Sequence, residues 1–411
     1  MQPSATVAVF RAFLHARWLQ ARLKSRAALE AHQQRGVRAW RSHLTASFPH
    51  LTGEALVMDK ARLMADFAAY NQGQITVDEV RAALDTGEVQ PGVACGASTG
   101  TSGNRGLYVI TDQERYRWLG TILAKGLPDV WRRRHRVAVI LPQNSALYQA
   151  GNQSRWLKLA FYDLRDGPEA WGGALEAFDP TVMIAPPKVL RWLAENADLN
   201  RLRPRRLYAG AETLDPPDRR IIEENFGLRL GQIYMATEGL FGVSCSHGTL
   251  HLTEDFVRFD LEPVGEGLVS PRVTDFSRRY QVMSRYQMND LLQLADKPCA
   301  CGSALQAVEA VVGRQDDVFW FDEVMVTPDV LRNAVLNADP SIEDFRLRQG
   351  TDGRVELALP VAVSETAKAA AVQGVETLLK RRGVEASVGL AELDQADLYA
   401  RKLRRVERLR S

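Results

Sequence analysis

Short apolar segments alternate with helix-like segments through the middle of this chain, and this alternation restricts its fold more than any other feature. Four strand-like runs lie at residues 137–141, 181–185, 206–210 and 228–235. Residues 188–196 and 215–226, which lie between them, have apolar positions at helical spacing. Strands that alternate with helices in this way predict an α/β fold built on a largely parallel sheet.

The pattern changes twice after this region. Residues 242–294 are β-rich and punctuated by glycines, and a smaller unit begins near Gly313 with a predicted hairpin at 345–359. We therefore predict a large N-terminal α/β domain with layered sheets and a β-rich subdomain, followed by a small C-terminal α+β domain. The predicted boundaries are a helical segment at 1–57 packed on the main domain, a main domain at 58–312 with its β-rich part at 242–312, and a small mobile domain at 313–411.

The composition fits a multi-domain globular protein. The 411 residues include 52 Lys and Arg against 50 Asp and Glu, and the net charge of +2 gives no overall field that would hold nucleic acid. No apolar run approaches the ~20 residues that span a bilayer, and no signal-peptide pattern opens the chain, so we expect a cytoplasmic protein. Residues 7–40 predict a basic amphipathic helix; packing on the protein body is favoured, and weak contact with a membrane surface stays open.

A loop rich in Ser, Thr and Gly at residues 98–106 is the strongest local signal. Its three glycines allow sharp backbone turns, and its four hydroxyls are donors suited to phosphate oxygens. The candidate phosphate-binding residues are Ser98, Thr99, Gly100, Thr101, Ser102 and Gly103. The loop leads into a strand-like segment, so it differs from a Walker A loop, whose Gly-Lys-Ser/Thr opens a helix. The same composition, taken alone, is also typical of a flexible surface loop.

Three of the four cysteines gather in two short segments of the β-rich part. Cys299 and Cys301 are too close in sequence for an ordinary disulfide, and Cys245 precedes His247 and His251. Thiolate and imidazole ligands favour zinc, and four of them complete a tetrahedral structural site. We predict a zinc site formed by Cys245, His251, Cys299 and Cys301, with His247 as a substitute ligand. Plain packing of buried cysteines is the alternative.

Four motifs in a fixed order resemble the adenylate-forming superfamily of acyl- and aryl-CoA synthetases, peptide-synthetase adenylation domains and luciferases. These motifs, with a Gly-Ala-Glu sequence before the second, lie at residues 98–106, 234–239, 285–290 and 313–317. The chain is more similar to the phenylacetate–coenzyme A ligase branch, whose members carry a Cys-x-Cys-Gly sequence before a Gly-Arg-x-Asp-Asp hinge, as residues 299–302 do here. The resemblance runs from about Met58 to the C-terminus.

This resemblance implies ATP-dependent activation of a carboxylic acid to an acyl-adenylate with release of pyrophosphate. The acyl group would then pass to the thiol of coenzyme A or of the phosphopantetheine on a carrier protein. By the same resemblance Glu238 binds Mg²⁺, Thr237 contacts the α-phosphate, and Asp316 is the hinge. The other motifs contain further residues that the resemblance implies bind the nucleotide: Gly210, Ala211, Glu212, Tyr234, Asp290 and Arg314.

The chain departs from the family pattern in three places. Lys402 matches the catalytic lysine near the C-terminus, but Arg401 replaces the usual glycine before it and six basic residues crowd this tail, so a solvated basic tail is the alternative. The lysine common in the phosphate loop is missing, and Arg105 can supply positive charge there. Residues 319–323 replace a glycine-rich turn after the hinge, which leaves the thiol-transfer conformation in question.

The acyl pocket of this family is built in part from the region between residues 143 and 162. Tyr148 and Phe161 are candidates for its wall, although aromatic side chains here are also typical of plain core. We expect an aromatic acid, such as a hydroxybenzoate or an arylacetate. The polar stretches at 144–148 and 151–153 suit the hydroxybenzoate.

The leading hypothesis is an acid–thiol ligase of the AMP-forming kind that uses ATP, Mg²⁺ and a structural zinc ion. A catalytically degenerate scaffold is one alternative, and the altered sequence at 319–323 is its main motive. A zinc-containing nucleic-acid-binding protein is another, but the net charge and the lack of aromatic residues among the arginines of the tail weigh against it. The identity of the acid, the thiol acceptor and the formation of a homodimer stay open.

Overall fold

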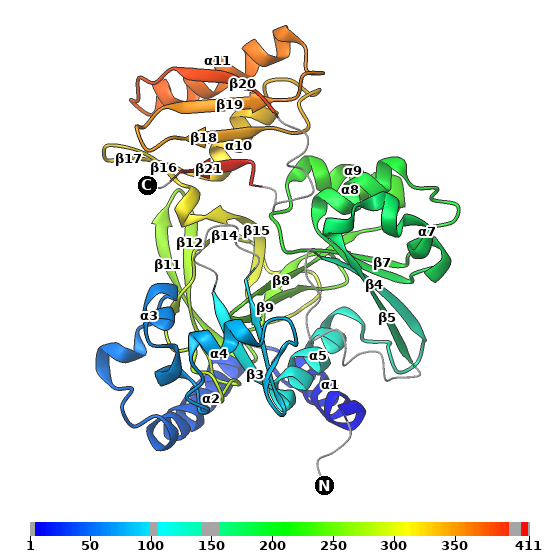
Figure 1. Ribbon diagram of the computed structural model, residues 1–411, viewed down its shortest axis with the longest axis vertical. Coiled ribbons are helices and arrows are strands. Elements are labelled where there is room, and N and C mark those ends of the chain that lie inside the picture. Colours follow the sequence, from blue (N-terminus) through cyan, green and yellow to red (C-terminus); the bar gives the residue numbers. More distant parts are fainter. Residues whose placement is uncertain (1–4, 99–105, 142–155, 394–403, 410–411) are drawn as a thin grey trace. The chain divides into compact units, whose positions relative to one another are not determined.

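The computed structural model describes residues 5–98, 106–141, 156–393 and 404–409. The chain divides into two compact units (Figure 1). Unit 1 comprises Met1–Met288 and Gln293–Ala310, and unit 2 comprises Asn289–Leu292 and Val311–Ser411. The predicted main domain at 58–312 includes the short segment Asn289–Leu292, which the structure assigns to unit 2. Both units combine helices with sheets, and the predicted fold class is confirmed.

Two long helices open unit 1. α1 (Ala5–Arg22) and α2 (Arg26–Ser47) replace the single helix predicted over residues 7–40. The break has a local cause, because the Ser25 hydroxyl accepts a hydrogen bond from the Ala28 N–H at 3.2 Å and so caps α2. No helix within the described residues is both long and apolar enough to cross a bilayer.

A three-stranded antiparallel sheet supports the predicted phosphate loop. It contains β1 (Glu88–Gln90), β2 (Val93–Ala97) and β3 (Leu107–Thr111), and Ala97 pairs with Leu107 where the loop leaves the sheet. α5 (Asp112–Gly126) follows β3 at once. The side chains of Thr111 and Glu114 cap its first turn reciprocally, which fixes where the strand ends and the helix begins.

The parallel part of the large sheet confirms the alternation seen in the sequence. Its neighbouring parallel strands, in the order β8-β7-β6-β4-β5, are β8 (Leu230–Ala236), β7 (Arg206–Gly210), β6 (Val182–Ala185), β4 (His135–Leu141) and β5 (Leu157–Asp163). The helices between these strands are α7 (Pro168–Phe178), α8 (Pro187–Asn196) and α9 (Pro216–Phe226) (Figure 1). Each of these helices has proline in its first turn, where the missing N–H has no helical partner in any case.

The sheet continues with antiparallel strands in the β-rich part. These strands are β9 (Gly239–Ser244), β10 (Leu250–Leu252), β11 (Val257–Gly265), β12 (Leu268–Asp275), β13 (Tyr286–Gln287), β14 (Asp290–Leu294) and β15 (Ala307–Arg314). The strand order is β11-β12-β14-β15-β10-β9-β8, and β13 pairs with β12. A turn between β8 and β9 therefore marks the change from parallel to antiparallel pairing, and the Thr-Glu pair at residues 237–238 occupies it.

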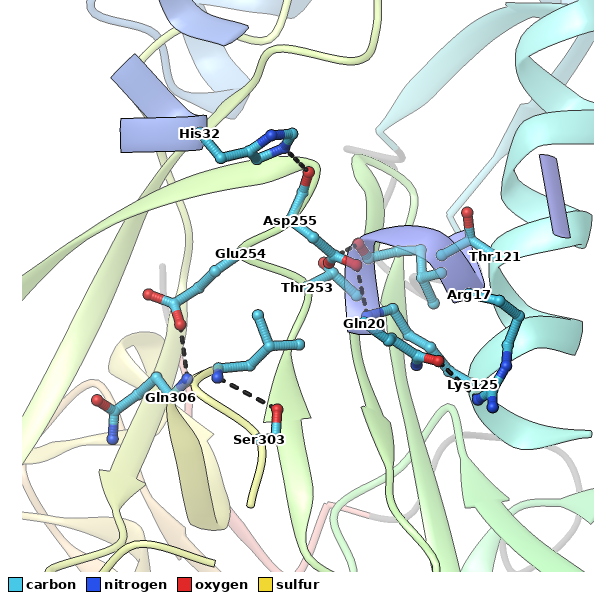
Figure 2. Close-up of polar contacts among 12 residues, drawn as sticks. Arg17, Gln20, His32, Thr121, Lys125, Thr253, Glu254, Asp255, Ser303 and Gln306 are labelled. Atoms are coloured by element: carbon cyan, nitrogen blue, oxygen red, sulfur yellow. Dashed lines mark hydrogen bonds and ion pairs between the residues drawn. The ribbon is translucent and has the colours of Figure 1, made fainter. Parts of the chain in front are cut away.

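Buried polar contacts join the helices of unit 1 to its β-rich part. Lys125 of α5 forms an ion pair with Asp255 at 2.8 Å, and both side chains are buried. His32 of α2 contacts the Asp255 carbonyl at 2.9 Å (Figure 2). Glu254 accepts a hydrogen bond from the Gln306 N–H at 2.6 Å. These contacts fix α2 and α5 to the segment between β10 and β11.

Unit 2 has its own core and its own sheet. The strands β20 (Val388–Glu392), β19 (Val355–Leu359), β18 (Arg346–Gln349) and β21 (Val406–Arg408) pair in that order, with α10 (Pro328–Leu336) and α11 (Glu365–Arg381) contributing to a separate apolar cluster. A small hairpin of β16 (Phe319–Phe321) and β17 (Val324–Val326) occupies the altered segment after the hinge. Asp322 at its tip has a φ of 52°, in the left-handed region.

Candidate active site

The two ends of the predicted phosphate loop are held together. The Ser98 N–H donates to the Gly106 carbonyl at 2.7 Å, and the Gly106 N–H donates to the Ser98 hydroxyl at 2.9 Å. The pair thus closes the base of the loop immediately after β2 and before β3. The other predicted phosphate ligands lie outside the described residues; they are Thr99, Gly100, Thr101, Ser102, Gly103 and Arg105.

The turn after β8 lies beside the base of this loop. The Thr237 methyl group would be 4.0 Å from a Cβ placed on Gly106. One small cavity is lined by Gly106, Thr237 and Glu238 together with Lys60 and Tyr286. Unit 1 therefore brings together two of the motifs that the sequence singled out, although about 130 residues separate them in the chain.

Glu238 is held at both its backbone and its side chain. The Tyr286 hydroxyl donates a hydrogen bond to Glu238 Oε1 at 2.9 Å. The Arg278 guanidinium donates to the Glu238 carbonyl at 2.8 Å. A carboxylate oriented in this way, next to a predicted phosphate loop, is suited to bind a hard cation such as Mg²⁺.

Arg278 is a fully buried cation beneath this turn. Its side chain is 1% exposed and also donates to the Val109 carbonyl at 3.0 Å and to Gln281 Oε1 at 2.5 Å. Burial lowers the pKa of Arg278, and the charges of Glu114, Asp275 and Glu238 oppose that shift. The guanidinium links β3 to the turn after β8, so it fixes these two segments relative to each other.

Lys60 is a basic side chain near the loop that sequence reasoning missed. It is the first residue of α3 (Lys60–Ala65), and its Cε would be 3.5 Å from a Cβ on Gly106. Asp59 starts this helix by accepting from the Arg62 N–H at 2.7 Å. Lys60 therefore brings positive charge to the base of a loop that lacks the family lysine.

The Gly-Ala-Glu segment begins at Gly210, the last residue of β7. Ala211 has a φ of 67°, and this left-handed conformation turns the chain sharply after the strand. The Glu212 carboxylate, which is 2% exposed, forms an ion pair with Lys188 of α8 at 3.2 Å. Tyr234 of β8 packs its ring at 5.6 Å from that of Phe241. The predicted nucleotide contacts of these residues stay predictions.

The hinge motif of unit 2 is tied to the segment that carries Asp290. Asn289 donates through its amide to Asp316 at 2.6 Å, and the Asp316 N–H donates to Asn289 Oδ1 at 3.2 Å. The Gln315 N–H donates to the Asn289 carbonyl at 2.8 Å. Asp290 is half-buried and Arg314 is exposed. These paired bonds explain why residues 289–292 belong to unit 2.

The C-terminal tail returns to the predicted hinge within unit 2. Arg404 forms ion pairs with Asp317 and, at 2.7 Å, with Glu407. Burial raises the pKa of Asp317, and the charge and hydrogen bond of Arg404 oppose that shift. Lys402 itself lies outside the described residues. Residues 404–408 are packed within unit 2, since Arg405 is buried and β21 pairs with β18.

The four predicted zinc ligands come together in unit 1. Their ligand atoms all lie within 4.8 Å of one another. Cys245 follows β9, His251 lies on β10, and Cys299 and Cys301 lie between β14 and β15. Within the cluster, Cys245 Sγ lies 3.7 Å from Cys299 Sγ, and Cys301 Sγ lies 3.3 Å from His251 Nε2.

The surroundings of this cluster fit a tetrahedral metal. His251 Nδ1 faces the Leu305 carbonyl at 3.1 Å, an arrangement that leaves Nε2 for a metal ion. Burial opposes ionisation of Cys299, but hydrogen bonds from the Cys301 backbone and from Thr249, His251 and Cys301 lower its pKa to about 6. His247, the predicted substitute, donates its backbone N–H to Cys245 Sγ at 3.4 Å and is not one of the four clustered residues.

One of the two residues predicted to line the acyl pocket lies within the described part of the chain. Phe161 lies on β5, half-buried against the core of unit 1. Tyr148 lies outside the described residues. The assignment of both residues to an acyl-binding wall stays a prediction.

Three of the four residues that support the site lie outside the recognised motifs. Lys60, Lys188, Arg278 and Tyr286 each act on a motif residue that is distant in sequence or lies in another element. Only Tyr286 falls within a recognised segment, the one at 285–290. The fold, not local spacing, brings the other three to the site.

Comparison with known proteins gives a partial sequence match. No family model matches the chain. A phenylacetate–coenzyme A ligase from Thermus thermophilus is 26% identical over 209 residues, which is 46% of this chain and 47% of that protein. The match thus spans about half the length of this curated relative.

Solved structures show the same fold over most of the chain. A 2-hydroxyisobutyryl-CoA ligase in its postadenylation state is 18% identical, with a TM-score of 0.66 over 93% of this chain and 89% of that one. Fatty acyl-adenylate ligases from E. coli and L. pneumophila reach 0.53 at 14% identity over 72% and 65%. An amide bond synthetase from Marinactinospora thermotolerans also reaches 0.53 at 14% identity, over 74% and 66%. These matches confirm, at the level of the fold, the resemblance to adenylate-forming ligases.

Proposed function

We propose that this chain, which has the fold of the adenylate-forming ligases, activates a carboxylic acid with ATP and then transfers the acyl group to a thiol. The observation that carries the proposal is the convergence in unit 1 of the closed base of the loop 98–106 with Thr237 and Glu238. Two motifs that are weak separately meet at one cavity, as a phosphate-binding site requires.

The first reaction consists of attack by a carboxylate oxygen on the α-phosphorus of ATP. An oxygen–phosphorus bond forms, the bond to the β-phosphate oxygen breaks, and pyrophosphate leaves. Negative charge has to be stabilised on the α-phosphate and on the leaving group. In this proposal the Thr237 hydroxyl and the positive charges of Lys60 and Arg105 would supply that stabilisation, and Glu238 would hold a Mg²⁺ ion that contributes to it. By the family resemblance, Lys402 would stabilise charge on the same phosphate.

The second reaction is thiol transfer. A thiolate attacks the acyl carbonyl of the adenylate, a thioester forms, and AMP leaves. Coenzyme A and the phosphopantetheine of a carrier protein carry the same thiol and are both candidate acceptors. The proposed acid is aromatic, a hydroxybenzoate or an arylacetate, which the match to a phenylacetate–coenzyme A ligase supports. A cytoplasmic location, where ATP and free thiols are available, is part of the proposal.

Zinc has a structural role in this proposal. Cys245, His251, Cys299 and Cys301 supply four ligands, so the ion would have no open position for a water or a substrate. Bound there, zinc would join the turn after β9, strand β10 and the loop between β14 and β15. The chemistry of acid activation does not pass through it.

The test is ATP–pyrophosphate exchange across a panel of aromatic and small aliphatic acids, with Mg²⁺ present. We expect exchange that depends on the acid and is greatest with a hydroxybenzoate or an arylacetate. A folded protein that exchanges with no acid in the panel would support the degenerate scaffold instead. Thioester formation with coenzyme A and with a carrier protein then identifies the acceptor.

A further inference from the structure

Helix α1 has apolar side chains on two opposite faces. Val9, Phe13, Ala16 and Leu19 form the buried face, which packs along α5. Gly120 of α5 allows the close approach, because a Cβ there would be 2.6 Å from that of Ala12. The other face carries four large side chains that stay exposed, Val7 at 41%, Phe10 at 39%, Leu14 at 49% and Trp18 at 52%. We call these four residues the α1 stripe.

The geometry of a helix places the four side chains together. At about 100° per residue, positions 7, 10, 14 and 18 fall within one face roughly 80° wide, opposite the buried face. They make up half of the large apolar side chains that are exposed among the described residues. Packing against α5 accounts for the apolar residues on the buried face of α1. It does not account for the apolar residues of the α1 stripe, which stay in contact with water.

Basic residues border the α1 stripe on both sides. Arg11 and Arg22 follow one edge by helical position, Arg17 follows the other, and all three are exposed. The Arg22 guanidinium lies over the Trp18 ring at 5.2 Å. The first acidic residue of the chain is Glu30, so no carboxylate of the helix opposes these charges.

A second basic segment adjoins the stripe in space. The Phe10 ring meets the Trp131 ring edge-on, with centroids 4.7 Å apart. Trp131 is followed by Arg132, Arg133 and Arg134, all exposed. The contact between the two rings therefore adds three consecutive arginines to the border of the stripe, although 121 positions separate Phe10 from Trp131.

We propose that the α1 stripe docks on an anionic phospholipid surface. Exposed Phe, Leu and Trp on one helix face, with arginines along both edges, match the pattern of helices that lie in the membrane interface. The arginines would meet lipid phosphates and carboxylates, and the apolar side chains would enter the boundary with the acyl chains. The inference is independent of the reaction proposed above, since it involves neither the loop 98–106 nor Glu238.

A second copy of this chain fits the surface less well. An isologous contact through the α1 stripe would bring the same arginines of both copies together without an acidic counterpart on the helix. Lipid binding has no such conflict. The buried pair Lys125–Asp255 fixes α5, and with it α1, to the body of unit 1 (Figure 2), so the stripe can dock without unfolding.

The experiment is vesicle co-sedimentation with the full chain. Vesicles of phosphatidylcholine with 30% phosphatidylserine are compared with vesicles of phosphatidylcholine alone, at low and high salt. We expect binding to the anionic vesicles that weakens at least tenfold at high salt. Leu14→Glu with Trp18→Glu should abolish it. The matched control is Val361→Glu with Leu390→Glu, two exposed apolar residues of unit 2, which should leave binding unchanged.

A charge variant separates the two parts of the surface. Each basic residue near an anionic membrane contributes at most about fivefold to the affinity. Replacing all three arginines, Arg132→Gln, Arg133→Gln and Arg134→Gln, should therefore weaken binding to anionic vesicles by at least tenfold. Thermal melting confirms that each variant is folded. Absence of binding to anionic vesicles by the unaltered chain would overturn the proposal, and so would equal binding by the Leu14→Glu, Trp18→Glu variant. A dimer that this variant dissociates, without lipid binding, would assign the stripe to a second copy.

Discussion

Tyr286 donates a hydrogen bond from its hydroxyl to the Glu238 carboxylate at 2.9 Å, and this contact joins two motifs that the sequence could recognise only separately. Glu238 would hold Mg²⁺ in the proposed reaction, and Tyr286 would fix the orientation of its carboxylate. In that reaction Tyr286 would be a positioning residue, because it would act through Glu238 and not on the substrate.

Replacing Glu238 should remove the proposed metal ligand. We expect Glu238→Gln to lower acid-dependent ATP–pyrophosphate exchange by roughly 10²–10³-fold, since placement of Mg²⁺ would supply on the order of 3–4 kcal/mol of transition-state stabilisation. Glu176→Gln is the matched control, because Glu176 pairs loosely with Arg201 at 3.7 Å on the surface. Near-normal exchange in Glu238→Gln would mean that Glu238 has no part in metal binding.

Replacing Tyr286 should have a smaller and different effect. Tyr286→Phe keeps the ring and removes the hydrogen bond, so we expect about a tenfold loss of exchange. The Mg²⁺ concentration needed for half-maximal exchange should rise, which a purely structural role of the ring would not cause. The measurement is a Mg²⁺ titration of exchange at saturating ATP. An unchanged Mg²⁺ requirement would contradict the positioning role.

Lys60 should supply charge at the base of the phosphate loop. We expect Lys60→Met to raise KM for ATP or lower kcat/KM for ATP by about tenfold, since its Cε approaches Gly106. Lys158→Met is the control, because Lys158 is an exposed lysine on β5 of the same unit. Equal kinetics in both variants would show that Lys60 does not replace the lysine that the phosphate loop lacks.

The sequence was sufficient to predict the order of strands and helices, but not the side chains that hold the candidate site together. Strands such as β4 were predictable because a short apolar run bounded by proline is too short for a helix and is typical of a buried strand. The break between α1 and α2 was missed because Ser25 interrupts the helix by a cap without disturbing the apolar spacing. Arg278 and Lys60 were missed because a buried cation and a helix N-terminus reach the site only through tertiary packing.

The clustering of Cys245, His251, Cys299 and Cys301 could be predicted from the sequence because cysteine is rare in this chain, and zinc as its ligand stays a prediction. We expect purified protein to contain about one zinc ion per chain, and Cys301→Ser to lose it and to lower the melting temperature by several degrees. Cys95→Ala is the control for metal content, since Cys95 lies buried in β2 and outside the cluster. Elemental analysis and thermal melting measure both effects. Protein without metal and with unchanged melting in Cys301→Ser would exclude the site.

Lys402 and Asp316 are predicted to act in different half-reactions. Arg404, two positions after Lys402 in the sequence, forms an ion pair with Asp317, which is next to the predicted hinge residue Asp316. Lys402→Ala should abolish adenylate formation yet leave thiol transfer from a preformed acyl-adenylate largely intact, because charge on the α-phosphate develops only in the first step. Lys380→Ala, at an exposed lysine of α11, is the control.

Asp316→Pro should have the opposite effect. Proline at this position fixes φ and removes the N–H that donates to Asn289 at 3.2 Å, so rotation at the hinge should be restricted. We expect thiol transfer to fall more than adenylation. The two half-reactions are measured separately, by pyrophosphate exchange and by single-turnover transfer from a synthetic acyl-adenylate. Equal loss of both half-reactions in both variants would show that the tail and the hinge are structural here, and that the β16–β17 hairpin has replaced a mobile joint with a fixed one.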